Sequence, residues 1–139
     1  MPTFSYPYQM AYSDLGQLGH IPALQVGIQT INGDASPIDI DAYLDSGAMF
    51  SLFDGAVLSA LNLNVLDGRL RLVSPIRGPA VETRVLPVRL LHEHLGNFDL
   101  EIGFSTSQIS RNLLGRDFFD RVQIAFREHH LTFYINPTP

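Results

Sequence analysis

Alternation between apolar and polar residues is the feature that most constrains how this sequence can fold. It is clearest at residues 24–29, 38–45 and 97–104, where apolar residues occupy every second position. A period of two places the apolar side chains on one face of an extended strand, because successive side chains point to opposite faces. The sequence therefore predicts half-buried β-strands along most of its length. Shorter or less regular segments of the same kind are 69–73, 81–90, 122–126 and 131–135.

Helical periodicity is confined to two short segments. Asp54 is placed to cap a helix that extends to Asn62, and a second helix is expected from Gly115 to Phe119. The turn signals between the strands have the spacing that is typical of an all-β barrel or sandwich. Pro87 lacks a backbone donor and favours an edge position for the strand that contains it.

Size and composition exclude several classes of function. With 139 residues the chain is most simply one domain, and we expect residues 1–20 to form an N-terminal arm and residues 21–139 the domain. The net charge of −5 and the scattered arginines argue against nucleic-acid or anionic-membrane partners. Because cysteine is absent, disulfides, zinc–thiolate sites and thiol nucleophiles are excluded. The sequence shows no signal-peptide pattern and no membrane-spanning apolar run, so a cytoplasmic location is expected.

Asp45 ends one of the predicted strands and has two interpretations. By alternation it continues the polar face that carries Asp39 and Asp41, which predicts a solvated side chain. However, the strand stops here at Ser46 and Gly47, and the chain then becomes apolar. Glycine permits a sharp backbone turn and a serine hydroxyl can hydrogen-bond it, so the second interpretation is a carboxylate that is fixed in place.

Two sequence blocks together resemble one protein family. Residues 44–48, Leu-Asp-Ser-Gly-Ala, resemble the Asp-Thr/Ser-Gly-Ala signature of aspartic proteases. Residues 112–119, Asn-Leu-Leu-Gly-Arg-Asp-Phe-Phe, resemble the hydrophobic-hydrophobic-Gly-Arg-Asp/Asn block of the retroviral-type, or retropepsin-like, proteases. The resemblance covers roughly residues 21–135 and is to the bacterial single-domain kind. It implies an all-β fold, a closed acid-protease barrel with one or two short helices, whose single lobe forms a homodimer.

The resemblance implies an aspartic endopeptidase that hydrolyses polypeptides without a cofactor or a metal. This chemistry needs two facing carboxylates that share one proton, because two neighbouring carboxylates do not both ionise easily. The signature occurs once in the chain, so the second carboxylate has to be Asp45 of another copy. Ser46, Gly47 and Ala48 are expected to support the catalytic turn. The segments expected to build the dimer sheet are 4–12 and 131–135.

The second block is expected to be structural rather than catalytic. Asp117 would cap the short helix or bond the turn after Asp45. Many retroviral enzymes have an acid at the position of Met49, and that acid pairs with the arginine of the second block. Arg116 therefore needs another partner, in the arm or in the second subunit. The four residues of this motif are Leu114, Gly115, Arg116 and Asp117.

A flap that closes over the substrate is expected in residues 72–81, with Ile76, Arg77 and Gly78 at its tip. The prolines on either side of this tip remove backbone donors that a flap can offer to a substrate. A plain surface hairpin therefore stays open as the alternative for this segment.

Two alternatives to a protease stay open. The same fold can serve as a catalytically inactive binding or dimerisation module. The two blocks can also match by coincidence in an unrelated β domain.

His92-Glu93-His94 places two histidines on one strand face, but no third metal ligand accompanies them, so a solvated loop is predicted. His129 and His130 are expected to be exposed in a hairpin turn.

Overall fold

The computed structural model describes residues 4–13, 16–33, 36–74 and 78–137, and strands dominate them. The prediction of an all-β fold with one or two short helices is confirmed. None of the helices in these residues has the length and apolar character needed to span a bilayer. The strands are β1 (Phe4–Pro7), β2 (Gln9–Ser13), β3 (Gly16–Ile21), β4 (Ala23–Gln29), β5 (Ile38–Leu44), β6 (Leu52–Asp54), β7 (Arg69–Val73), β8 (Val81–His92), β9 (Gly96–Ser105), β10 (Asn112–Leu114), β11 (Val122–Arg127) and β12 (Thr132–Pro137). The helices are α1 (Ala56–Ala60), η1 (Val65–Asp67), α2 (Arg116–Phe119) and η2 (Glu128–His130).

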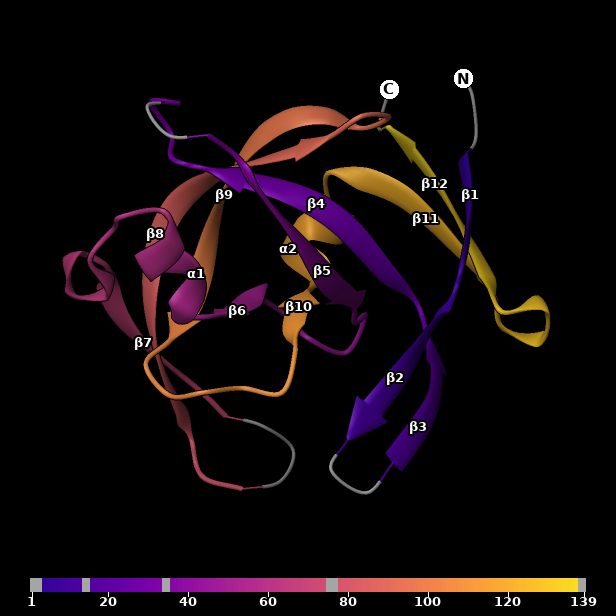
Figure 1. Cartoon of the computed structure of the whole chain (residues 1–139), viewed down its shortest axis with the longest axis horizontal. Helices are drawn as coiled ribbons and strands as arrows, with labels where there is room; N and C mark the ends of the chain where they lie inside the picture. The colour runs from indigo at the N-terminus through magenta and orange to yellow at the C-terminus, as the bar shows by residue number, and fades with distance from the viewer. Residues whose placement is uncertain (1–3, 14–15, 34–35, 75–77, 138–139) are drawn as a thin grey trace.

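Six strands close into a barrel that forms the body of the molecule (Figure 1). Their order is β4-β5-β10-β6-β9-β8, and β8 returns to pair with β4. The β5–β10 and β6–β9 pairings are parallel, and the other pairings of the barrel are antiparallel. β7 pairs with β8 and continues the sheet beyond the barrel. The predicted closed barrel is therefore confirmed.

A three-stranded sheet, β1-β12-β11, lies beside the barrel (Figure 1). β1 pairs antiparallel with β12, with Phe4 opposite Ile135, so both ends of the described chain meet in this sheet. β2 and β3 form a hairpin that connects β1 to β4 along the chain. The segment that the sequence predicts as an extended arm is thus mostly strand, and its Tyr8 and Ala11 are buried.

Aromatic side chains from the barrel, α2 and the outer sheet pack together in one core. Phe53 and Phe104 are fully buried and meet edge to face, with ring centroids 6.1 Å apart. Phe118 of α2 and Phe133 of β12 are fully buried in the same cluster. Burial of one such side chain contributes about 1.5–3 kcal/mol to folding. The core therefore fixes α2 and β12 relative to the barrel.

The sequence-based prediction of an edge strand at Pro87 is wrong, because β8 has neighbours on both sides. Residues 81–85 of β8 pair with β7, and residues 89–91 pair with β4. Pro87 lies between these two pairings, opposite Glu101 of β9. The proline is tolerated there because its missing N–H falls where β8 passes from one neighbour to the other.

The prediction of a solvated loop at residues 92–94 is also wrong, because both histidines are half-buried against β1. Phe4 stacks on His94 with ring centroids 3.6 Å apart, and Tyr6 Oη lies 3.5 Å from His92 Nε2. The aromatic side chains of β1 thus replace water around this segment. The histidines of η2, by contrast, are exposed, as predicted.

Candidate active site

Asp45 lies directly after β5, at the start of a tight turn. The parallel pairing of β5 with β10 extends to this point, because Asp45 N donates to Leu114 O at 2.9 Å. Gly47 N donates to the carboxylate oxygen Oδ1 at 2.9 Å, and Ala48 N donates to Asp45 O at 3.2 Å. Ser46 is exposed in the turn, and the Asp45 side chain is only partly exposed. The structure therefore favours a carboxylate that is fixed in place.

Gly115 brings the second sequence block against the Asp45 turn. A Cβ atom at this position would lie 2.7 Å from Ala48 O and 2.9 Å from Phe50 O, which is closer than a side-chain carbon can approach. Arg116 N also donates to Ala48 O at 2.8 Å. Because only glycine permits this approach, the two loops form one unit.

Asp117 connects the two loops through hydrogen bonds with Ser51, which is fully buried. Ser51 N donates to both carboxylate oxygens of Asp117 at 3.0 Å, and Ser51 Oγ donates to Oδ1 at 2.7 Å. Gly115 N donates to Ser51 Oγ at 3.0 Å, and Phe118 N donates to Asp117 Oδ1 at 2.8 Å. Asp117 thus contacts both the first turn of α2 and the loop that follows Asp45, the two roles between which the sequence left the choice open.

Ser51 is a residue of this unit that the two sequence blocks do not include. The available signal was a hydroxyl inside the otherwise apolar run 48–53, because a buried hydroxyl requires hydrogen-bond partners. Arg116 is exposed, and its side chain makes no hydrogen bond or ion pair with another residue in the described part of the chain. The partner that the sequence predicts for Arg116 stays a prediction.

A cavity of about 560 Å³ opens beside Asp45. One wall is the Asp45 turn with the residues that follow it, and the other comes from β7 and the first residue of β8. Most of the lining side chains are apolar, which suits the side chains of an extended peptide. The lining residues are Asp45, Gly47, Ala48, Met49, Phe50, Leu52, Arg71, Leu72, Val73, Ser74, Val81 and Leu113.

The β7–β8 hairpin, in which the sequence predicts a flap, borders this cavity with the residues nearest its tip. Gly78 has a φ of +96°, a left-handed conformation that favours glycine, and no atom crowds its Cβ position. Ile76 and Arg77, the other predicted tip residues, lie outside the described residues.

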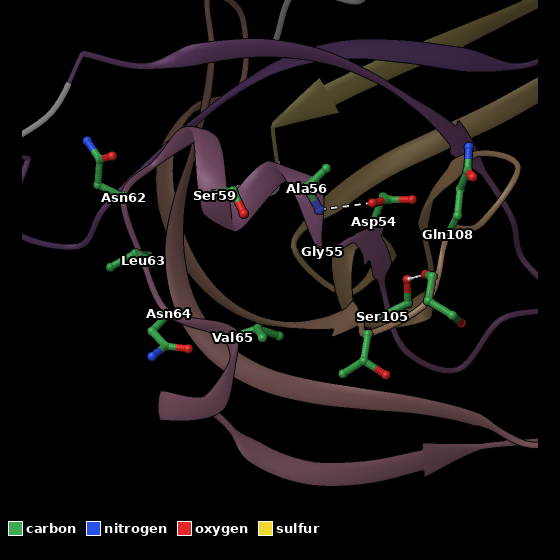
Figure 2. A pocket seen from close by; sticks show the side chains of 12 residues that line it. Asp54, Gly55, Ala56, Ser59, Asn62, Leu63, Asn64, Val65, Ser105 and Gln108 are labelled. Carbon is green, nitrogen blue, oxygen red and sulfur yellow. Dashed lines mark hydrogen bonds between the residues drawn. The ribbon is translucent and has the colours of Figure 1, made fainter.

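A second hollow, of about 860 Å³, does not include Asp45 (Figure 2). It is lined by the start of α1, the α1–η1 loop and residues 105–108. Asp54 is its charged residue, and both carboxylate oxygens accept backbone N–H groups, Oδ1 from Ala56 at 2.9 Å and Oδ2 from Ile109 at 3.0 Å. This carboxylate therefore has a structural role. In the described part of the chain, no three His, Cys, Asp or Glu side chains are grouped as metal ligands.

The fold is similar to those of solved aspartic proteases. A retropepsin-like aspartic protease from Rickettsia conorii superposes with a TM-score of 0.62 over 98% of this chain and 94% of that chain, at 12% sequence identity. The EIAV protease complexed with the inhibitor HBY-793 gives a TM-score of 0.51 over 74% of this chain and 88% of that chain, at 26% identity. No protein-family model matches the sequence, and no curated protein does. The chain therefore has the retropepsin-like fold.

Proposed function

We propose that this chain is an aspartic endopeptidase that hydrolyses peptide bonds as a homodimer. The observation that carries the proposal is the Asp45 carboxylate, which the Gly47 N–H fixes at the edge of a largely apolar cavity. Similarity to solved aspartic proteases supports a hydrolase of this kind. Gly47 supports the carboxylate from the turn through its N–H, and Ala48 contributes to the lining of the cavity.

The reaction uses Asp45 and its copy from a second subunit. The two carboxylates hold one proton between them, because two neighbouring negative charges repel each other strongly. The ionised carboxylate takes a proton from a water molecule as that water attacks the scissile carbonyl carbon. The protonated carboxyl group donates its proton to the carbonyl oxygen. One copy of the chain supplies half of this pair, so activity and dimerisation are linked.

The free edge of β11 is where the second copy is expected to dock. β1 and β12, the two segments that the sequence predicts in the dimer sheet, pair with each other within one chain. β11 is the other end of this sheet, and β12 is its one strand partner in the described residues. Phe126 of β11 is 40% exposed and borders the same shallow hollow as Asp45 and Ser46. Antiparallel pairing of two β11 edges would therefore bring the two Asp45 turns toward each other.

The substrate of the proposed enzyme is an extended polypeptide. The cavity volume of about 560 Å³ is within the range of pockets that enclose small ligands or several side chains. An extended peptide places alternate side chains on opposite sides, so the apolar wall at Met49, Phe50 and Leu113 would receive apolar residues near the scissile bond.

A cleavage profile on a peptide library derived from a proteome tests the proposal. The unmodified chain is expected to cleave a defined subset of peptides, and Asp45→Asn is expected to reduce cleavage to background. Asp41→Asn is the matched control, because Asp41 is an exposed carboxylate on β5, the strand that leads to Asp45, and lies outside the cavity lining. This control is expected to keep full activity.

The physical state of each variant distinguishes the possible outcomes. Asp45→Asn should keep the melting temperature and the dimer of the unmodified chain, as measured by sedimentation. Cleavage that persists in Asp45→Asn would contradict the assignment of Asp45. A folded protein that cleaves no peptide in the library would support the inactive binding or dimerisation module instead.

A further inference from the structure

Arg71 is a second charged residue in the lining of the Asp45 cavity. It lies on β7, and its guanidinium carbon is 4.0 Å from the centroid of the Phe50 ring. Its Nη2 extends toward β9, where it lies 3.2 Å from the position that a Cβ atom of Gly103 would occupy. The other described lining residues, apart from Asp45, are uncharged. A positive charge therefore stands in a wall that is otherwise apolar or neutral.

The carboxylates that act on Arg71 are already engaged by other residues. Both oxygens of Glu101 accept hydrogen bonds from Arg69 at 3.1 Å, and Asp117 is bonded to Ser51. No carboxylate of the described residues forms an ion pair with Arg71, and its Nε and Nη2 are buried without a hydrogen-bond partner. Burial lowers the pKa of Arg71, and the charge of Arg69 lowers it further, while Asp117 and Glu101 oppose this shift.

The geometry of the guanidinium indicates which ligand could accept hydrogen bonds from Nε and Nη2. Nε and Nη2 lie on one edge of the group, and that edge can donate two parallel hydrogen bonds to the two oxygens of a carboxylate. Since no hydrogen bond from the described residues holds the guanidinium of Arg71, turning this edge from Gly103 toward the cavity costs mainly the contact with Phe50. An unpaired and partly buried cation is unfavourable, so a carboxylate that enters the cavity gains an interaction that the free chain lacks.

We propose that Arg71 selects substrates that carry an acidic side chain, Asp or Glu, close to the scissile bond. The inference rests on the proposed peptidase function of the same cavity. Leu72, Val73 and Val81 line the same cavity and provide apolar surface for the neighbouring side chains of the peptide. The preferred peptide therefore has one acidic residue within an apolar segment.

Matched peptides that differ by Glu or Gln at one position test this selection. The positions scanned are those on either side of a cleavage site found in the library. At one of them, kcat/KM of the unmodified chain is expected to be about tenfold or more higher for Glu, because hydrogen bonds between charged groups are the strong ones. Arg71→Met is expected to abolish the difference. Arg71→Lys is expected to keep part of it, because lysine retains the charge but not the fork of donors.

Arg69→Gln is the matched control for this experiment. Arg69 is an arginine of the same strand, but it is exposed and already paired with Glu101. The control is expected to keep the preference for Glu. A preference that Arg71→Met leaves unchanged would overturn the inference, and so would equal cleavage of the Glu and Gln peptides at every position.

Binding to the Asp45→Asn chain separates this inference from the proposed function. Fluorescence anisotropy with the same peptides should show tighter binding of the Glu peptide, and the difference should vanish below the ordinary Glu pKa of about 4.3. Tighter Glu binding without any cleavage by the unmodified chain would uphold the inference and contradict the peptidase. Cleavage without a Glu preference would uphold the peptidase and contradict the inference. If Arg71→Met does not fold, this pH series decides alone, since a preference that persists below that pKa overturns the inference.

Discussion

The two walls of the Asp45 cavity differ in how completely their polar groups are paired. On the side of the two loops, which we call the loop unit (residues 45–51 and 115–118), buried Ser51 and the Asp117 carboxylate bond each other and the backbone around them. On the side of β7, the guanidinium of Arg71 has two buried donors that find no hydrogen-bond partner among the residues the structure describes. The comparison suggests that the loop unit is fixed before a substrate binds, whereas the donors of Arg71 in the β7 wall are paired only when a substrate binds.

The largest effect is expected from Gly115→Ala, which attacks the closest contact of the loop unit. The new Cβ would lie 2.7 Å from Ala48 O and 2.9 Å from Phe50 O, and both are backbone atoms that cannot rotate away. We expect the free energy of unfolding to fall by about 3 kcal/mol or more, as in other strongly overpacked sites, with loss of cleavage. Urea unfolding measures the change.

Gly96→Ala provides the control for this substitution. The backbone conformation at Gly96, with a φ of +82°, also favours glycine, but no atom lies within 4 Å of its Cβ position. Its replacement should therefore cost only the backbone preference, about 1–2 kcal/mol. A loss at Gly115 that is no larger than the loss at Gly96 would show that the loop unit can adapt, and the contrast between the two walls would weaken.

A smaller loss is expected from Ser51→Ala, which removes one hydroxyl from the loop unit. The substitution removes one donor from the Asp117 carboxylate, which keeps its bonds from Ser51 N and Phe118 N, and it leaves the buried Gly115 N–H without its acceptor. We expect a loss of about 2 kcal/mol in the free energy of unfolding, because a buried donor that is left unpaired keeps its desolvation cost. Ser59→Ala, on the exposed face of α1, should change stability by less than about 0.5 kcal/mol. Equal effects at the two serines would contradict the role of Ser51.

The alternation in the sequence predicts the strands but leaves a barrel or a sandwich open, and the resemblance of the two blocks to one family predicts the closed barrel. The period-two pattern at residues 24–29, 38–45 and 97–104 predicts strands that the structure contains as β4, β5 and β9. The two blocks occur in the order that the retropepsin-like family has, and Asp45 N indeed bonds Leu114 O. Local patterns are informative here because strand alternation and glycine turns are fixed by neighbouring residues.

The partners of Ser51 and the surroundings of His92 and His94 could not be predicted in the same way. Ser51 bonds a carboxylate 66 positions away, and Tyr6 approaches His92 across 86 positions. Such contacts depend on how the sheets pack, which a single sequence does not encode locally. Arg71 was missed for the same reason, since its alternation on β7 resembles that of exposed Arg69.

His92 offers a milder test, as a half-buried titratable group outside the cavity. Burial lowers its pKa below the ordinary value of about 6.5, His94 adds to this shift and Glu93 opposes it. Below that pH the unfolded chain takes up a proton that the folded chain does not, so stability is lost as the pH falls and is unaffected at higher pH. Melting temperatures across this range should decrease less in His92→Phe than in the unmodified chain. His130→Phe, at an exposed position, should retain the original pH dependence.

The smallest effect on stability is expected from Arg71→Met, and it tests the other side of the comparison. Methionine keeps the apolar contact with Phe50 and removes a partly buried cation that has no ion-pair partner in the described residues. The free energy of unfolding should therefore stay within about 0.5 kcal/mol of the unmodified chain or rise, since loss of an unpaired buried charge removes its desolvation cost. Arg69→Gln, which breaks an exposed ion pair, should likewise have little effect on stability. A loss near 2 kcal/mol in Arg71→Met would show that Arg71 stabilises the fold as Ser51 does, and the β7 wall would then be as fixed as the loop unit.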